Sequence, residues 1–468
     1  MIYDKFLVDE LSVIAIYNKV KEIFKERIFL FESVINNSDG NYSFIVIGEK
    51  ERVKYQNEKT YYFDGEKENI LDIDVFGFLK NYYKSIDYEY YRKKSKEIGI
   101  GFVDGFIGYI GYDMVKVFEP VLKPVMDNLE DETKIPDFYM IRPKIILGFS
   151  HKSSELTVII NDENYNDKLL TIKNSLKSSY KHSPLKKAEL LSEPKFVFSK
   201  EKFFEMVSLA KENIRAGDIF QIVLSNRLKV KAKLDRLSFY RKLRSKNPSP
   251  YLYYLDIDDF AIIGSSPEVM VRLTDNMILL RPIAGTRKRG ENALRDLELE
   301  NDMINDPKEV AEHIMLVDLG RNDVGRVARA GSVKVEELMR VERYSHVMHM
   351  VSDVVGVLDK KYDMFDLFKA TFTAGTMSGA PKIKAMELIA ENEGLKRGYY
   401  AGSIGYFGFD GNMDSAITIR TALIKDDEVI FQAGAGIVAD SKPELEYKEV
   451  NNKLGALVAT LKELENEK

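Results

Sequence analysis

Two pairs of glutamates have the spacing needed to hold a divalent cation. Glu309 and Glu312 lie three residues apart, as do Glu446 and Glu449, and Lys453 follows four residues after Glu449. Residues at i and i+3 or i+4 lie on the same face of a helix, so each pair can point two carboxylates at one place. Carboxylates beside one lysine suit Mg²⁺ and an anionic substrate. The same spacing is also typical of a solvated helix surface with salt bridges, which is the competing interpretation.

Further segments carry polar groups that could bind an anion. Thr373–Lys382 (TAGTMSGAPK) places small and hydroxyl residues before a helix, where free N–H groups can cradle a carboxylate or phosphate; a plain tight loop is the alternative. Arg281–Gly290 (RPIAGTRKRG) reads as a basic loop, and Asp318–Arg326 (DLGRNDVGR) favours a structural salt-bridge network. His349 lies in a strand-like run, where a histidine is more often a core residue than a catalyst. Together these residues indicate a Mg²⁺-dependent enzyme that acts on a small anion.

The composition excludes several classes of protein. The chain of 468 residues contains no Cys, which rules out a disulfide, a thiolate nucleophile and a Cys-ligated zinc or iron–sulfur site. With 69 Lys and Arg against 74 Asp and Glu, the net charge of −5 argues against a nucleic-acid-binding surface. No apolar run approaches the roughly 18 residues of a membrane span, and the start MIYDKFLVDEL lacks the features of a signal peptide. We therefore expect a soluble, cytoplasmic protein with no nucleic-acid or membrane partner.

The elements that would position these residues change character along the chain. A Lys- and Ser-rich connector between about residues 161 and 200 predicts a boundary between a region at 1–180 and a second region at 199–466. Helices are predicted at Ser199–Ala216, Pro307–Leu319, Met364–Ala370, Pro381–Glu393 and Pro443–Glu465. Strands are predicted at Tyr42–Gly48, Ile219–Leu224, Tyr251–Leu255, Ala261–Gly264, Val269–Leu273, Met277–Arg281, Ile417–Ile424 and Glu428–Ala433, with a strand or hairpin at Gly99–Tyr112. Several strands follow one another without a helix between them, which favours an α+β fold with large antiparallel sheets.

A series of motifs carries a resemblance to a known family. The motifs are, in order, PIAGTRKRG, EHIMLVDLGRNDVGRV, VMH, TAGTMSGAPK, ITIRTA, AGAGIVADS and ELEYKEVNNK. They resemble the chorismate-utilising enzyme family, and within it the synthase subunits of anthranilate synthase, from Phe203 to Leu457, with a weaker segment from Phe29 to Gly48. The resemblance implies antiparallel sheets packed as a sandwich with helices outside. It further implies a catalytic, chorismate-binding domain at 199–466 and a tryptophan-binding feedback segment within 1–180.

Two positions indicate which reaction the resemblance implies. Gln221 stands where isochorismate- and salicylate-forming relatives have a lysine that activates water, and Ala284 stands where aminodeoxychorismate synthases have a lysine that attacks the ring. Direct attack by ammonia on chorismate is then expected, giving anthranilate and pyruvate in the first step of tryptophan synthesis, catalysed by a carbon–oxygen lyase. The alternatives are an aminodeoxychorismate synthase and a non-catalytic, tryptophan-sensing relative.

The resemblance also implies roles for residues within the motifs. Glu312 and Glu449 would hold Mg²⁺, with Glu309 and Glu446 helping through water. Glu268 resembles the acid that protonates the departing ring hydroxyl. The implied catalytic residues are Glu268, His349, Thr376 and Gln221. The implied substrate-binding residues are Gly285, Thr286, Tyr400, Arg420, Gly434, Gly436 and Lys453.

Two expectations concern other molecules. The segments FLFES and NPSPY resemble the two walls of a feedback site, so Ser33, Asn247, Pro250 and Tyr251 are expected to bind tryptophan, with Phe31 in place of the usual leucine. Because the chain lacks the nucleophilic Cys that a glutaminase needs, ammonia is expected from a separate glutamine amidotransferase subunit or directly from solution. The family implies a complex of two chains of each kind.

Overall fold

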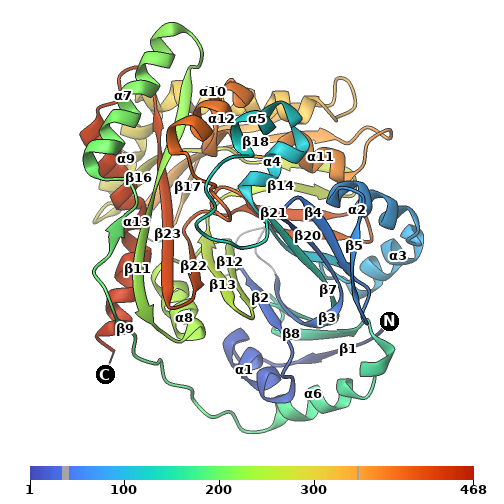
Figure 1. Ribbon diagram of the computed structural model, residues 1–468. Helices are drawn as coiled ribbons and strands as arrows, with labels where there is room; N and C mark the ends of the chain where they lie inside the picture. Colours follow the sequence, from blue (N-terminus) through green and yellow to red (C-terminus); the bar gives the residue numbers. More distant parts are fainter. Residues whose placement is uncertain (34–41, 345–346, 468) are drawn as a thin grey trace.

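Two long strands link the two sheets of the molecule. The computed structural model describes residues 1–33, 42–344 and 347–467. Strands β3 (Tyr42–Gln56) and β7 (Phe138–Ser150) pair along most of their length, with a bulge between Glu49 and Glu51. Beyond the bulge the neighbour of β7 changes from β8 to β6. Since a bulge bends a strand, β3 and β7 pass from one sheet into the other (Figure 1).

The first sheet is antiparallel throughout and joins both ends of the chain. Its hydrogen-bonded order is β1 (Ile2–Leu7), β8 (Glu155–Ile160), β7, β3, β2 (Ile28–Glu32), β12 (Tyr251–Ile257), β13 (Phe260–Ser266), β22 (Thr421–Lys425), β23 (Glu428–Ile437) and β11 (Gln221–Lys233). The short strands β9 (Glu189–Leu190), β10 (Lys195–Phe196) and β19 (Gly379–Ala380) also pair with β11.

The second sheet is also antiparallel. Its order is β5 (Glu68–Leu71), β4 (Lys59–Phe63), β3, β7, β6 (Gly105–Ile110), β20 (Ser403–Gly408), β21 (Met413–Ile417), β14 (Val269–Thr274), β15 (Met277–Leu280) and β18 (Val347–Val357). β18 continues along the same edge to β16 (Ile283–Lys288) and pairs with β17 (Lys334–Arg343) on its other edge. The α+β class with large antiparallel sheets is thus confirmed.

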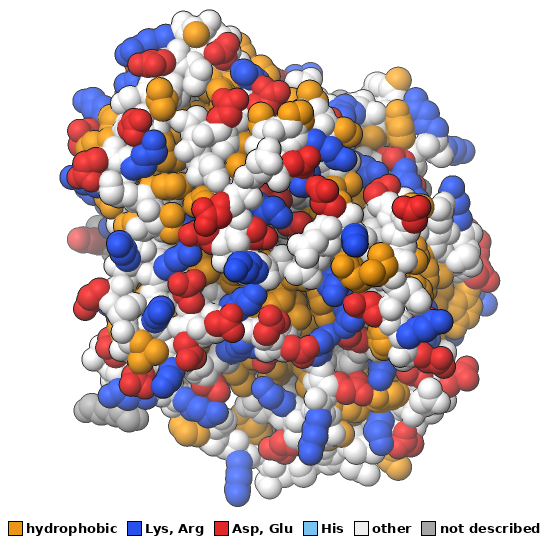
Figure 2. Space-filling view, in the orientation of Figure 1, with side chains coloured by type: hydrophobic (Ala, Val, Ile, Leu, Met, Phe, Trp, Pro, Cys, Tyr) orange, Lys and Arg blue, Asp and Glu red, His pale blue; other side chains and the backbone are white. Residues whose placement is uncertain are grey.

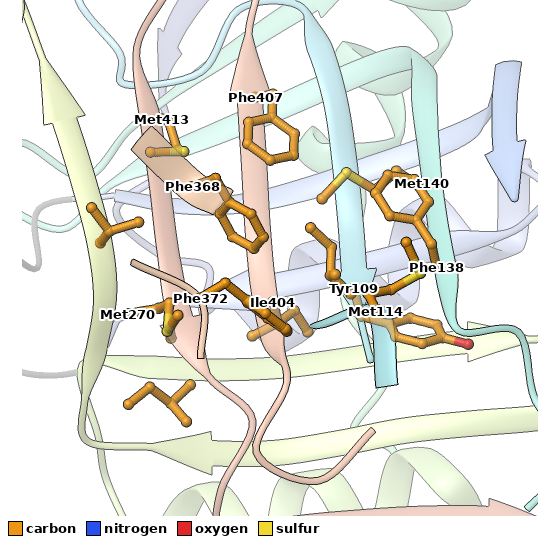
Figure 3. Close-up of a cluster of buried hydrophobic side chains, with 14 of the residues drawn as sticks. Tyr109, Met114, Phe138, Met140, Met270, Phe368, Phe372, Ile404, Phe407 and Met413 are labelled. Carbon is orange, nitrogen blue, oxygen red and sulfur yellow. The ribbon is translucent and has the colours of Figure 1, made fainter. Parts of the chain in front are cut away.

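Alternation along the strands of the first sheet separates two hydrophobic cores. In β13, Ile262 belongs to a cluster shared with the second sheet, whereas its neighbour Ile263 belongs to a cluster shared with helices. Because successive side chains point to opposite faces of a sheet, the two clusters lie on opposite faces of the first sheet. The first cluster fills the space between the sheets and extends to helices on the second sheet, with Phe76 and Phe368, whereas the second lies outside the sandwich. Figure 3 shows part of the first cluster, which includes Phe138 from the N-terminal region and Phe407 from the C-terminal region. The ring of Phe76 lies 5.9 Å from that of Phe138 and 6.3 Å from that of Phe407. The sandwich with helices outside is confirmed as well.

Helices cover the outer faces of both sheets. The outer core of the first sheet includes side chains of α1 (Val13–Ile23), α6 (Lys168–Lys177), α7 (Lys200–Ala216), α8 (Arg236–Lys246), α12 (Lys382–Glu393) and α13 (Pro443–Glu465). The remaining helices are α2 (Val75–Lys84), α3 (Tyr88–Ile98), α4 (Val115–Phe118), α5 (Lys123–Met126), α9 (Ala293–Ile304), α10 (Pro307–Gly325) and α11 (Met364–Thr371). Three-residue 3-10 turns lie at Tyr112–Met114, Pro120–Leu122, Glu163–Tyr165 and Gly375–Met377.

Four of the five predicted helices are confirmed within one residue of their ends, but α10 continues six residues beyond the predicted Leu319, to Gly325. The segment Arg281–Gly290, interpreted as a basic loop, contains strand β16 instead.

Two strand predictions are also wrong in detail. Gly99–Tyr112 contains one strand, β6, which pairs with β7 and β20 rather than with itself as a hairpin. Ile417–Ile424 is interrupted at residues 418–420, where the chain leaves β21 and enters β22. Arg420 adopts a left-handed backbone with φ +52° at this break. Alternation cannot reveal such a break, because the apolar–polar pattern of Ile417, Thr418, Ile419 and Arg420 continues through it.

The regions 1–180 and 199–466 are hydrogen-bonded to each other. β2 pairs with β12, and β6 pairs with β20. The polar connector between the regions contains α6 and, after it, irregular chain with the short strands β9 and β10. The division into two regions stays a prediction about the organisation of the sequence. Within the described residues, no helix is long and apolar enough to cross a membrane.

Candidate active site

Hydrogen bonds between distant segments gather the predicted site residues at one end of β11 and β23. Gln221, the first residue of β11, donates from Nε2 to Oε1 of Glu312 on α10 at 3.1 Å. On α13, Lys453 Nζ donates to the carbonyl of Gly434 on β23 at 2.8 Å. Lys453 also forms an ion pair with Glu449 at 2.7 Å. The two glutamate-bearing helices therefore meet over these two strands.

Local sequence explains where the glutamate-bearing helices begin. The side chain of Asp306 accepts hydrogen bonds from the N–H groups of Lys308 and Glu309, and Pro307 occupies the first turn. A capping carboxylate followed by proline is a strong start for a helix. α13 likewise has Pro443 in its first turn. These starts place Glu309 and Glu446 in the first turn of their helices, with Glu312 and Glu449 one turn later.

Glu268 is a buried acid between β13 and β14. Its side chain accepts a hydrogen bond from Thr376 Oγ1 at 2.8 Å, and the residue is 7% exposed. Burial raises the pKa of Glu268 to about 7, against the opposing effects of the Thr376 bond and of the positive charges of Lys453 and Arg420. A carboxyl group in this state can hold a proton near neutral pH and release it, as a general acid must.

Among the described residues, each glutamate pair has one member with an ion-pair partner and one without. Burial raises the pKa of Glu312, and the nearby charges of Glu309 and Glu449 raise it further, while the Gln221 bond lowers it. Glu309 accepts a hydrogen bond from Arg287 at 2.9 Å, and Glu449 pairs with Lys453. Burial also raises the pKa of Glu446. Within the described ranges, Glu312 has no ion-pair partner.

The donor set fits Mg²⁺ in its chemistry. Mg²⁺ binds through one or two carboxylates and keeps several waters, and Glu312 and Glu449 provide carboxylates from two helices. The Oε1 atom of Gln221 is buried and has no hydrogen-bond partner in the part of the chain that the structure describes. A cation would also offset the mutual repulsion among these glutamates. In the described residues, no three His, Cys, Asp or Glu side chains already stand together in a metal-binding group.

His349 on β18 is held in one tautomer. Its Nδ1 lies 3.1 Å from the carbonyl oxygen of Gly285 and 3.0 Å from Thr286 Oγ1. Because a carbonyl oxygen only accepts, Nδ1 carries the proton and Nε2 has the free lone pair. Burial lowers the pKa of His349, which favours this neutral form. Gly285 has φ +62° at a bulge in the β16–β18 pairing, a conformation that favours glycine.

The break between β21 and β22 turns Arg420 toward the site. Burial lowers the pKa of its guanidinium, and Tyr400, Glu268 and Glu449 are the groups whose charges act on it. Among the described residues, no side chain forms a hydrogen bond or ion pair with this guanidinium. The side chain is half-buried, so water offsets only part of the cost of its missing partner. Its planar fork is suited to a ligand carboxylate.

Two glycines of β23 make room at the floor of the site. A Cβ atom at Gly436 would lie 2.5 Å from Gln221 Nε2, and one at Gly434 would lie 3.0 Å from the Tyr400 hydroxyl. Both distances are too short for a side chain without a shift of its neighbours. The predicted substrate-binding glycines are therefore positions of close packing between site residues.

The predicted tryptophan residues also come together, and Tyr251 pairs with Ser266, two residues before Glu268. β2 pairs with β12 through Glu32 and Leu252, which brings Ser33 beside Tyr251. The hydroxyl of Ser33 is buried and has no hydrogen-bond partner among the described residues. Asn247, three residues before Pro250, donates to Ser265 Oγ at 3.1 Å, and Tyr251 donates to Asp414 at 2.9 Å. An unsatisfied buried hydroxyl is consistent with a ligand at this place.

Sequence reasoning missed a buried charged pair behind the site. Arg397 is 1% exposed and forms an ion pair with Glu393 at 2.6 Å. The four-residue spacing of the pair was a signal, but it is shared with ordinary surface salt bridges. By contrast, the salt-bridge network expected in Asp318–Arg326 is present: Asp318 pairs with Arg321 at 2.9 Å and Asp323 with Lys382 at 2.6 Å.

Comparison with known proteins places the chain in a family. Residues 27–459 match the model of the chorismate binding enzyme family. Anthranilate synthase component 1 of Aquifex aeolicus is 42% identical over 98% of this chain and 94% of its own length, and that of Geobacillus stearothermophilus is 38% identical over 98% and 93%.

Solved structures agree with this placement. The crystal structure of anthranilate synthase component I from Streptococcus pneumoniae is 35% identical, with a TM-score of 0.78 over 96% of this chain and 98% of that chain. The menaquinone-specific isochorismate synthase of Escherichia coli is 18% identical with a TM-score of 0.71, over 98% of this chain and 94% of that chain, and so shares the fold. The chain belongs to the chorismate binding enzyme family.

Proposed function

We propose that this chain is the synthase component of an anthranilate synthase, a carbon–oxygen lyase of tryptophan biosynthesis. It would convert chorismate and ammonia into anthranilate, pyruvate and water. The relatives named anthranilate synthase component 1 span nearly the whole chain. The observation that carries the chemistry is the buried Glu268, bonded to Thr376 and close to the unpaired Arg420. This arrangement offers an acid and a carboxylate-binding cation at one place.

In the first half of the reaction, Glu268 would donate its proton to the departing C4 hydroxyl of the ring. The C4–O bond breaks and water leaves while the nitrogen of ammonia forms a bond to C2. The raised pKa of Glu268 keeps the proton available near neutral pH. Thr376 holds the carboxyl in place, and Arg420 and Tyr400 would bind a substrate carboxylate.

In the second half, the proton on C2 is removed and the C3–O bond breaks, which releases pyruvate and makes the ring aromatic. His349 is neutral with a free lone pair on Nε2, so it can accept or share a proton at this step. Glu312 and Glu449 would hold Mg²⁺, with Glu309 and Glu446 assisting. When bound, the ion would neutralise the ring carboxylate of the substrate.

The source of nitrogen distinguishes this proposal within the family. Ala284 and Gln221 stand where relatives with other reactions have a lysine, so neither position supplies an amine that could attack the ring. We propose that ammonia comes from a separate glutamine amidotransferase subunit, because this chain has no Cys to serve as the glutaminase nucleophile. We also propose that tryptophan binds beside Ser33, Asn247, Pro250 and Tyr251 and inhibits the enzyme.

The test is a product assay of the purified chain with chorismate, Mg²⁺ and ammonium at alkaline pH, with and without tryptophan. Anthranilate, detected by fluorescence and mass, together with one equivalent of pyruvate, supports the reaction. Suppression by tryptophan supports the feedback site. Aminodeoxychorismate as product would instead identify the folate-pathway relative, and tryptophan binding without any product would identify a sensor.

A further inference from the structure

One buried arginine bonds to two segments that form the site. Arg397 donates from Nη1 to the carbonyl of Met377 at 2.8 Å and from Nη2 to the carbonyl of Val223 at 2.8 Å. Met377 follows Thr376 in the chain. Val223 lies on β11, two residues after Gln221, and pairs with Gly436. A single guanidinium therefore connects the loop of the acid-binding threonine to the strand that forms the floor of the site.

The guanidinium is itself fixed by a second set of contacts. Glu393 accepts from Arg397 Nε at 2.9 Å and from Nη2 at 2.6 Å. The same carboxylate accepts from the N–H and the hydroxyl of Ser225 on β11, at 2.8 and 2.9 Å. The guanidinium carbon also lies 5.7 Å from the centre of the Tyr400 ring. These contacts use the planar, five-donor fork of arginine, which lysine cannot reproduce.

The loop that Arg397 contacts has little regular structure of its own. Thr376 lies in a three-residue 3-10 turn, Gly375–Met377, that is followed by the two-residue strand β19. The Val223 N–H bonds to the Ser378 carbonyl at 2.9 Å and fixes the end of the turn. Arg397 adds the bond at Met377, next to the threonine. The position of the Thr376 hydroxyl therefore depends on a side chain that does not touch the substrate region.

We propose that Arg397 is a positioning residue for the reaction proposed above: through the Met377 carbonyl it holds Thr376 where its hydroxyl bonds to Glu268. The inference rests on the proposed function for its kinetic consequence. Its structural part, the tie between Arg397 and the 373–382 loop, stands without it.

The chain offers a matched control in Arg227. This arginine is 2% exposed and also lies in the polar layer behind the site. It donates to Gln432 Oε1 at 3.1 Å, to Glu132 at 2.8 Å, to the carbonyl of Lys396 at 2.8 Å and, more weakly, to the main-chain carbonyl of Arg397 at 3.5 Å. None of these partners belongs to the 373–382 loop. Arg227→Lys and Arg397→Lys therefore each replace a guanidinium group with an ammonium group at a similarly buried position.

The experiment compares the two variants in the full-length protein. Hydrogen exchange followed by mass spectrometry should show faster exchange of backbone amides in residues 373–382 for Arg397→Lys and unchanged exchange there for Arg227→Lys. For the kinetic part, kcat/KM for chorismate is measured from pH 6 to 9. We expect a fall of about 10- to 100-fold for Arg397→Lys and a much smaller change for Arg227→Lys.

The pH profile separates positioning from a general loss of structure. The groups that face Glu268 are Thr376, Lys453 and Arg420, and the bond from Thr376 lowers the pKa of Glu268. Weakening that bond raises the pKa further, so the protonated acid persists to higher pH. The alkaline limb of kcat/KM should therefore move to higher pH in Arg397→Lys, as it should in Thr376→Val, and stay in place in Arg227→Lys.

Equal exchange in the two variants, or a limb that does not move in Arg397→Lys, would overturn the inference. If Arg397→Lys does not fold, the double variant Arg397→Met with Glu393→Gln removes both charges of the pair and takes its place, with the same expectations. If the unaltered protein makes no anthranilate, the proposed function fails, while the exchange comparison still decides whether Arg397 holds the loop.

Discussion

The cluster around Glu268 and the network around Arg397 both contain buried polar groups, and they adjoin at β11, where Gln221 belongs to the first and Ser225 to the second. They differ in how their polar groups are satisfied. Behind the site, Arg397 and Glu393 share two hydrogen bonds, and Ser225 adds two more to the carboxylate. In the site, Gln221 Oε1 has no partner among the described residues, and burial disfavours the charge of Arg420.

This difference separates groups kept for a ligand from groups kept for the fold. A buried polar group without a partner costs free energy, so it is retained only where something else compensates it. A saturated pair instead holds segments in place. Away from both regions, the surface mixes charges of either sign, as Figure 2 shows for one face of the molecule. Substitutions can therefore distinguish residues that serve a ligand from residues that stabilise the fold.

The largest effect is expected at the acid. Glu268→Gln should lower kcat for anthranilate formation by about 10³-fold, because the amide cannot deliver the proton, while the melting temperature stays the same or rises. The control is Glu393→Gln, which should destabilise the protein by about 3–5 kcal/mol because it breaks a buried ion pair. If Glu268→Gln, and not Glu393→Gln, is the variant that loses stability, Glu268 serves the fold and not the reaction.

The pH dependence of stability gives the next effect. The folded pKa of Glu268, about 7, lies above its ordinary value of 4.5. The contribution of Glu268 to stability is therefore complete below about pH 4.5 and is lost as pH rises through 7, at a cost of up to about 3 kcal/mol. Chemical denaturation at pH 5 and pH 8 should show Glu268→Gln gaining stability relative to the unaltered protein at the higher pH. An equal difference at both values would contradict the raised pKa.

Removal of Mg²⁺ tests the glutamate pairs. EDTA should abolish anthranilate formation. Added Mg²⁺ should raise the melting temperature, because at a hundred times its Kd it increases the free energy of unfolding by about 2.7 kcal/mol. Glu312→Gln should reduce this stabilisation, since Glu312, like Glu446, has no ion-pair partner among the described residues and would gain most from the cation. Sodium at equal ionic strength is the control. A melting temperature that responds equally to both salts would argue against a specific site.

Arg420 tests the site from its cationic side. Arg420→Met should raise KM for chorismate by about 10- to 100-fold, the effect of losing a charge-assisted hydrogen bond. The ligand-free variant should melt at about the same temperature as the unaltered protein, because the side chain removed is a half-buried cation with no protein partner among the described residues. Arg227→Met should melt lower, since it leaves Gln432 and the Lys396 carbonyl without their donor.

The smallest effect is expected at the tryptophan pocket. Ser33→Ala should weaken tryptophan binding by about 1 kcal/mol, or roughly fivefold in Kd, through loss of one hydrogen bond. The rise in melting temperature that tryptophan induces should be correspondingly smaller. Ser43→Ala is the matched control, because Ser43 Oγ already has a partner in His151 Nε2 at 2.7 Å. Equal loss of tryptophan binding in Ser33→Ala and Ser43→Ala would show that the Ser33 hydroxyl does not bind tryptophan.

Local sequence patterns predicted those helices and strands whose physical causes lie within a few residues of one another. Strand patterns located fewer than half of the 23 strands in the described residues, among them β11, β13 and β23, and they missed the long strand β7. The Asp-Pro start of α10 fixed the turn that carries Glu309. The three-residue spacing placed Glu309 and Glu312 on one face. Motif resemblance named the family and the site residues.

Only the tertiary structure decided which of those residues are short of partners. Glu312 meets Gln221 across 91 positions of the sequence, and Glu268 meets Thr376 across 108. The break that turns Arg420 inward and the burial of Arg397 likewise depend on strands that are distant in sequence. Burial and pairing are properties of neighbours in space, and a pattern that repeats every two or four residues carries no information about neighbours a hundred residues away.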